Sequence, residues 1–188
     1  MNHTKINPLE IINKYYPLDS EIRYLLVKHS EQVKNKALSI ARKHKEIQFD
    51  LQFIEEAAML HDIGIFLCAA PRIYCHGPNQ YIQHGFLGAD LLRAEGLARH
   101  ALVCERHTGV GISLEMIEHN KLPLPNRNLM PLSLEEQLIC YADKFYSKTQ
   151  LGDTHSIDRI RKSLSHFGES QVSVFDHWHL LFDPEPLV

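Results

Sequence analysis

The sequence lacks the features that mark membrane, secreted and nucleic-acid-binding proteins. Its longest apolar runs are far shorter than the ~20 residues that a membrane-spanning helix needs. Its first ten residues, MNHTKINPLE, are polar where a secretory signal requires an apolar segment. Lys and Arg (20) are balanced by Asp and Glu (23), so the formal net charge is -3 and no basic block is present. We therefore expect a cytoplasmic protein with neither a membrane partner nor a nucleic acid partner.

Cysteine is scarce and shows no paired spacing. The four cysteines, Cys68, Cys75, Cys104 and Cys140, form no C-x-x-C motif. Since no secretory signal is visible either, the sequence predicts a cytosolic protein with reduced thiols that have a structural role. A zinc site that uses Cys75 and His76 stays open as a minor alternative.

What the sequence does contain is apolar residues at three- and four-residue steps, which is the spacing of amphipathic helices. No alternating strand pattern is visible, so we predict an all-α fold in one domain over residues 1–188. A chain of this length can bury about 70% of its unfolded surface in one core. The expected helices cover residues 8–16, 20–45, 50–61, 81–95, 97–107, a short segment after Ser113, 133–148, 156–166 and 169–182, with loops at 68–79 and 121–132.

Five of these helices carry a polar residue at a position where the helical pattern requires an apolar one. Together with one direct neighbour, these residues are His29, His61, Asp62, His84, His107 and Asp143. A single inward histidine is usually a hydrogen-bonded core residue, but a buried carboxylate costs several kcal/mol unless it is paired or coordinated. No Arg or Lys lies in the same inward stripes as an obvious partner for both Asp62 and Asp143. A divalent cation would supply positive charge and geometry together, so the set predicts a metal centre.

The types of ligand narrow the choice of metal. Imidazole nitrogens and carboxylate oxygens without thiolate are suited to Fe, Mn, Zn, Ni or Co, and Mg is also compatible. We expect one or two divalent ions.

The order of these residues resembles the H…HD…D signature of the HD-domain superfamily. His29 is followed by His61 and Asp62 in HDIG (61–64), and Asp143 lies in YADKF (141–145). The match covers about residues 25–148, and residues 149–188 are expected to form C-terminal helices that pack on the core. The resemblance implies an HD-type helical bundle in which these four residues bind a first metal ion.

Two further histidines resemble the second-metal ligands of binuclear superfamily members. His84 lies in HGFLGADLL (84–92) and His107 in ERHTGVG (105–111). The resemblance implies that they bind a second ion, with Asp62 bridging the two. HDIGK, a motif of cyclic-dinucleotide phosphodiesterases, is not matched, because Ile65 stands at the lysine position and their GYP element is missing.

The function implied by this resemblance is that of a metal-dependent phosphohydrolase. A metal-activated water would attack a nucleotide or another small phosphate ester, with Asp62 in the catalytic set. Arg106 and Lys144 flank ligands in the sequence and are candidates for binding the phosphate, with Arg72 a weaker one. Each is equally well explained as a solvated surface cation. His76 is a candidate general acid, although a lone histidine in a loop is more often incidental.

Two other functions remain compatible with the ligand set. Some HD-fold proteins use similar ligands to hold a di-iron centre that activates oxygen, which would make this protein an oxygenase. The chain would otherwise be a regulatory binding module with an inactive metal site.

The loops and the C-terminal segment also leave alternatives open. Residues 68–80 form either a lid over the site or a fixed surface connection, and with residues 109–132 they are expected to recognise the substrate. Trp178 and Phe182 either pack back on the core or form the face of a homodimer.

Overall fold

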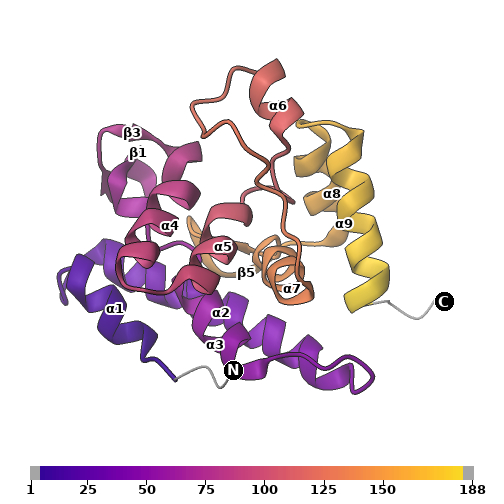
Figure 1. The fold of residues 1–188 in the computed structure, drawn as a ribbon, viewed down its shortest axis with the longest axis horizontal. Coiled ribbons are helices and arrows are strands. Elements are labelled where there is room, and N and C mark those ends of the chain that lie inside the picture. The colour runs from indigo at the N-terminus through magenta and orange to yellow at the C-terminus, as the bar shows by residue number, and fades with distance from the viewer. Residues whose placement is uncertain (1–4, 184–188) are drawn as a thin grey trace.

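The structure, a computed structural model, describes residues 5–183 and confirms the all-α fold (Figure 1). No helix of the described chain is long and apolar enough to cross a membrane. The α-helices are α1 (Pro8–Tyr15), α2 (Glu21–Lys43), α3 (Leu51–Leu60), α4 (His84–Ala94), α5 (Ala98–Arg106), α6 (Leu114–His119), α7 (Leu134–Asp143), α8 (Ile157–Ser165) and α9 (Glu169–Phe182).

Side-chain caps explain where several helices begin. Asn7 accepts a hydrogen bond from the backbone N–H of Leu9, and Pro8 follows at the first helical position. Ser20 caps α2 by accepting from the N–H of Arg23. Ser133 caps α7 by accepting from the N–H of Glu136, and the Glu136 carboxylate accepts from the N–H of Leu132.

The expected loop at 68–79 is instead a small sheet, which the sequence did not predict. Its strands are β1 (Cys68–Ala70), β2 (Cys75–His76) and β3 (Asn79–Gln80), and β1 pairs antiparallel with β2 and parallel with β3. Short 3₁₀ helices at Ile65–Leu67, Pro71–Ile73 and Tyr81–Gln83 connect these strands to their neighbours. Hydrogen bonds from Gly77 N–H to Cys68 and from the Asn79 amide to Leu67 favour a fixed connection over a lid.

The helix predicted for 133–148 is also shorter than expected. It ends at Asp143, and the chain then forms a hairpin of β4 (Tyr146–Ser147) and β5 (Gln150–Thr154). Lys148 therefore lies in a tight turn rather than in the last turn of a helix. The hairpin lies against α2, which brings residue 148 back toward the middle of the fold.

The apolar core consists of two large clusters that meet in the middle of the fold. One joins the C-terminal half of α2 to α7, α8 and α9, and the other joins the N-terminal half of α2 to α1, α4 and α5. On α2, Leu26 belongs to the second cluster and Val33 to the first. His29 lies between Leu26 and Val33 on α2, so the fold places a polar side chain at the boundary between the two apolar clusters.

The C-terminal helices α8 and α9 lie side by side along one edge of the molecule (Figure 1). Phe175, Trp178 and Phe182 of α9 are buried in the same cluster as α2 and α7. The proposal that Trp178 and Phe182 form a dimer face is therefore wrong, because only 3% and 1% of their surfaces are exposed. A homodimer through another surface stays a prediction.

We expect Glu56→Ala to destabilise this fold by about 1–3 kcal/mol, because it removes a buried hydrogen-bonding partner of His100, Ile6 and Gln52. Glu56 Oε2 lies 3.1 Å from His100 Nε2, and its Oε1 accepts hydrogen bonds from Ile6 N–H and the Gln52 amide. Urea unfolding measures the loss. Glu55→Ala, on the exposed face of the same helix, should stay within about 0.5 kcal/mol of the wild type. Equal midpoints for the two variants would contradict the expected role of the pair.

Candidate metal centre

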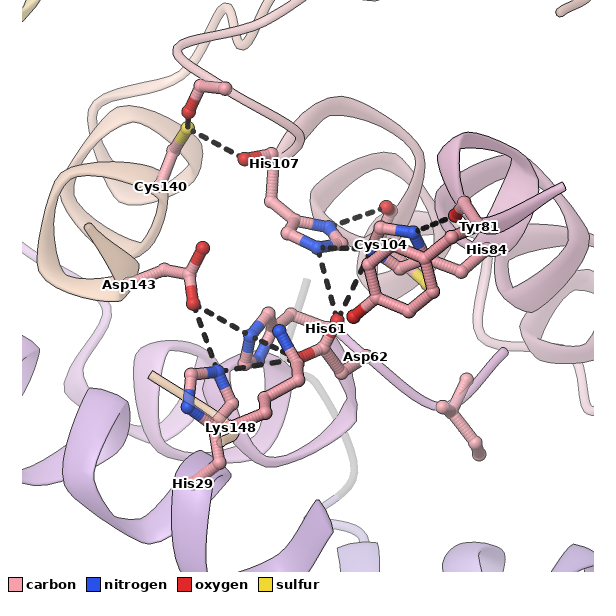
Figure 2. A network of polar contacts seen from close by, with 12 residues as sticks. His29, His61, Asp62, Tyr81, His84, Cys104, His107, Cys140, Asp143 and Lys148 are labelled. Atoms are coloured by element: carbon pink, nitrogen blue, oxygen red, sulfur yellow. Dashed lines mark hydrogen bonds and ion pairs between the residues drawn. The ribbon is translucent and has the colours of Figure 1, made fainter. Parts of the chain in front are cut away.

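The structure brings all six predicted ligands together in the interior (Figure 2). Five of them lie at helix ends or directly beyond one, since His61 follows α3, His84 begins α4, His107 follows α5 and Asp143 ends α7. His29 alone lies within a helix. Three of these ends are C-terminal, where the helix dipole places partial negative charge that favours a cation.

The first group of ligands comprises His29, His61, Asp62 and Asp143. His29 Nε2 lies 2.9 Å from Asp143 Oδ1 and 3.3 Å from Asp62 Oδ2. His61 Nε2 lies 3.1 Å from Asp62 Oδ2 and 3.5 Å from Asp143 Oδ1. One donor atom from each residue lies within 4.8 Å of the others, and all four residues are buried. These separations allow the four atoms to coordinate one ion.

The second group comprises His84, His107 and again Asp62. Asp62 Oδ1 lies 3.3 Å from His84 Nε2 and 3.2 Å from His107 Nε2. The two oxygens of one carboxylate therefore face different groups, Oδ2 the first and Oδ1 the second. Asp62 is the residue that a bridge between two cations requires.

The local backbone fixes how three of the imidazoles are protonated. In His61, His84 and His107, Nδ1 lies 2.6 to 2.8 Å from the carbonyl oxygen of the residue three positions earlier. A carbonyl only accepts hydrogen bonds, so Nδ1 carries the proton in each ring. In the neutral rings Nε2 then presents a lone pair to the centre, which is how a metal-binding histidine is commonly oriented.

This orientation creates a conflict that a cation would remove. His84 Nε2 and His107 Nε2 lie 3.0 Å apart, so two neutral rings protonated at Nδ1 would bring two lone pairs face to face, and these cannot hydrogen-bond to each other. Asp62 Oδ1 lies near both of these nitrogens and, among the described residues, forms no hydrogen bond of normal geometry. Buried polar atoms without partners are costly, so the residues present fit a site for divalent cations.

Lysines also lie in the centre, contrary to the expectation that no cation accompanies the two carboxylates. Lys148 Nζ lies 2.6 Å from Asp62 Oδ2, and Lys144 Nζ lies 2.9 Å from Asp143 Oδ2. Two ammonium groups thus balance two carboxylates. Neither lysine forms an ion pair with the Asp62 oxygen that faces His84 and His107, so the close approach of these two imidazoles is the stronger indication of a metal.

The surrounding charges shift the pKa values within the centre. Burial favours the neutral acid, but the charges of Lys148 and His61 outweigh it and hold the pKa of Asp62 well below its usual range. Burial lowers the pKa of His107 to about 4, which leaves this ring neutral with its lone pair free. For His61 the burial effect is outweighed by the charges of Asp62 and Asp143, and its pKa rises to about 9.

A close backbone approach brings the two groups together. A Cβ on Gly64, the last residue of HDIG, would lie 2.2 Å from the carbonyl oxygen of His84 and 2.5 Å from the N of Gly88. Only glycine permits this contact between the 61–64 segment and α4. The contact places His84 beside Asp62.

Comparison with known proteins agrees with this geometry, because the HD domain family matches residues 26–147. The chain belongs to the HD-domain family. No solved structure matches it significantly.

The chain is similar to proteins of Methanocaldococcus jannaschii, Thermoplasma volcanium and Picrophilus torridus. An uncharacterized protein of Methanocaldococcus jannaschii is 33% identical over 138 residues, which is 73% of each chain. A tRNA (cytidine(56)-2'-O)-methyltransferase of Thermoplasma volcanium is 34% identical over 82% of this chain and 40% of its own length. The methyltransferase of the same name from Picrophilus torridus is 30% identical over 68% of this chain and 33% of its own length. The chain thus spans less than half of either methyltransferase.

The other candidate residues of the HD domain lie outside the two ligand groups. Arg106 donates to Glu136 at 2.8 Å, so its proposed role in binding phosphate stays a prediction. Arg72 and His76 are exposed. The metal-competent groups found among the described residues contain neither His76 nor Cys75, and the Cys75 thiol donates to the carbonyl of Ile73.

Two residues at the centre were not predicted from the sequence. Lys148 was assigned to a helix end, and no local pattern indicates that a hairpin returns it to Asp62. Tyr81 stacks on His84, with ring centroids 4.6 Å apart, and Figure 2 shows its ring beside the second group. Its three-residue separation from His84 is the only signal in the sequence for this contact.

Proposed function

We propose that this HD domain is a metal-dependent phosphohydrolase that acts on a nucleotide or another small phosphate ester. The observation that carries the proposal is the position of Asp62, whose two oxygens face two separate groups of imidazole nitrogens. Such a shared carboxylate suits a pair of divalent cations, and paired cations are typical of enzymes that hydrolyse phosphate esters.

Each residue then has a definite task. His29, His61, Asp62 and Asp143 would hold one cation, and His84 and His107 would hold a second with Asp62. Bound cations supply an activated water and positive charge for the phosphoryl oxygens. The backbone carbonyls behind three of the imidazoles keep their Nε2 atoms directed at the centre. Lys144, which is bonded to Asp143 and to the carbonyl of His107, would position that carboxylate.

The names of two relatives raise tRNA as an alternative partner. Both methyltransferases extend far beyond the segment they share with this chain, and that segment contains the HD domain. We infer that methyl transfer belongs to the remainder of those proteins and not to this chain. The formal net charge of -3 gives no electrostatic support for tRNA binding, but tRNA belongs in the substrate screen.

The test is metal analysis of the purified chain, followed by a phosphate-release screen with Mn, Fe, Co and Mg. We expect at least one nucleotide or small phosphate ester to release phosphate. Chelation should stop the release, and added metal should restore it. His61→Ala should abolish turnover because it removes a donor of the first group, whereas His177→Ala, an exposed histidine of α9, should leave turnover unchanged.

The same screen separates the alternative functions. Oxygen uptake by the iron-loaded protein that depends on substrate, together with a mixed-valence paramagnetic signal, would favour an oxygenase. Bound metal without turnover on the whole panel, tRNA included, would favour a regulatory binding module. Phosphate release under anaerobic conditions excludes both.

A further inference from the structure

Lys148 occupies a position that the proposed metal chemistry does not explain. Its ammonium nitrogen lies 2.6 Å from Asp62 Oδ2, and its side chain is only 15% exposed. The same oxygen lies 3.1 Å from His61 Nε2 and 3.3 Å from His29 Nε2. Among the described residues, Lys148 forms an ion pair with Asp62 alone, and it shares this partner with the first group of ligands.

This sharing cannot persist when a cation binds. A divalent cation bound by His29, His61 and Asp62 would lie close to the Lys148 ammonium, because both would contact the same oxygen of Asp62. The two groups carry like charges. Their repulsion is strong in a buried site, where screening by water is weak. Either the cation binds weakly, or Lys148 moves away.

Lys144 offers a useful contrast. Its ammonium is bonded to Asp143 Oδ2 and to the carbonyl oxygen of His107, whereas the first group of ligands uses the other oxygen, Asp143 Oδ1. Two acceptors outside the immediate ligand atoms hold Lys144 in place. In the part of the chain that the structure describes, Lys148 has neither a second acceptor of this kind nor a separate carboxylate oxygen.

The segment that carries Lys148 allows it to move. Residue 148 lies in the turn between β4 and β5, and every residue of β5 is exposed. The hairpin contacts α2, and Tyr146 of β4 packs against the first core cluster, but neither large cluster contains a residue of the turn, so a change at the tip disturbs little packing. The four-carbon side chain can also swing on its own and keep its charge beside the centre.

We propose that Lys148 is an exchangeable counter-ion, which pairs with Asp62 in the metal-free protein and binds a phosphoryl oxygen once cations occupy the centre. The second half rests on the proposed function. Lys148 then acts twice: it neutralises a buried carboxylate before metal arrives, and it provides a positive charge for the substrate afterwards.

Metal affinity tests the first half without any assay of turnover. Removing the competing charge with Lys148→Met should tighten Mn²⁺ binding about 10- to 100-fold, measured by competition with a chromophoric chelator. Lys162→Met, which removes an exposed lysine of α8, should bind Mn²⁺ as the wild type does. Affinity equal to or weaker than that of the wild type in Lys148→Met overturns the proposal.

A measurement on the wild-type chain covers the case in which Lys148→Met does not fold. An amine-reactive reagent followed by peptide mass spectrometry should modify Lys148 faster when Mn²⁺ is present than when the protein is metal-free. Lys162 should react at the same rate in both states. No acceleration at Lys148 means that it stays on Asp62 and overturns the exchange.

Phosphate binding tests the second half. With Mn²⁺ at saturation, inorganic phosphate should bind at least about 10-fold more weakly to Lys148→Met than to the wild type or to Lys162→Met. Unchanged phosphate affinity overturns this half. A wild-type protein that shows the exchange but hydrolyses no phosphate ester would refute the proposed function alone, and turnover without any exchange would refute only the role of Lys148.

Discussion

Asp62→Ala should abolish turnover and reduce the affinity for both cations at least about 100-fold, which exceeds the usual cost of losing an outer-shell partner. Each oxygen of this carboxylate faces a different group of imidazoles, so one substitution removes a ligand from both groups. His61→Ala should weaken the first group only, and His84→Ala the second only. Metal content per chain after gel filtration measures the difference.

The comparison needs a control for the loss of a carboxylate in general. Asp90→Ala removes an exposed Asp of α4 that pairs with Arg93, and it should keep wild-type metal content and activity. Circular dichroism establishes that each variant is folded before its metal is measured. If Asp62→Ala retained as much metal as Asp90→Ala, Asp62 would not be the shared ligand.

Gly64→Ala should destabilise the protein by about 3 kcal/mol or more, and the variant should no longer bind the second cation. Its φ of -86° and ψ of -1° suit any residue, so the obstacle is space alone. The new methyl group would meet backbone atoms of His84 and Gly88, which cannot rotate out of the way. Helix α4 must shift, and His84 moves away from Asp62 with it.

Gly96→Ala is the matched control for this substitution. Gly96 has a φ of +76° and open space around its Cα, so alanine there is strained but meets no neighbour. We expect a loss of about 1–2 kcal/mol with both cations retained. Urea unfolding and metal stoichiometry measure both variants. Wild-type stability and full metal content in Gly64→Ala would mean that α4 is not packed against the 61–64 segment as described.

Much of the fold and five of the six candidate ligands could be predicted from helical periodicity, whereas Asp62 was indicated by its place beside His61 in HDIG. His29 follows Leu25 and Leu26 at helical steps and precedes Val33, so the stripe itself shows that this histidine points inward. Asp50 and Ser133 indicate helix starts through their own side chains. These are local signals, and each requires only a few neighbouring residues.

The features that the sequence did not predict depend on contacts between distant segments. Strands of two or three residues, such as Cys75–His76, are too short to show an alternating pattern. Lys148 and Asp62 are far apart in the chain, and only the hairpin after Asp143 brings them together. The pairing of Arg106 with Glu136 likewise joins two helices, so a cation that flanks a ligand in sequence need not face the same site.

The candidate metal centre lies at the boundary between the two apolar clusters, and this position affects the conformational freedom of the unfolded chain. His29 and Asp143 are 114 residues apart in the chain, and the fold brings them together because their helices, α2 and α7, pack against each other. An ion held by both would act as a cross-link that closes a very long loop, and such links restrict the unfolded ensemble more than short ones do. The metal would then hold the two halves of the protein together while it also serves the reaction.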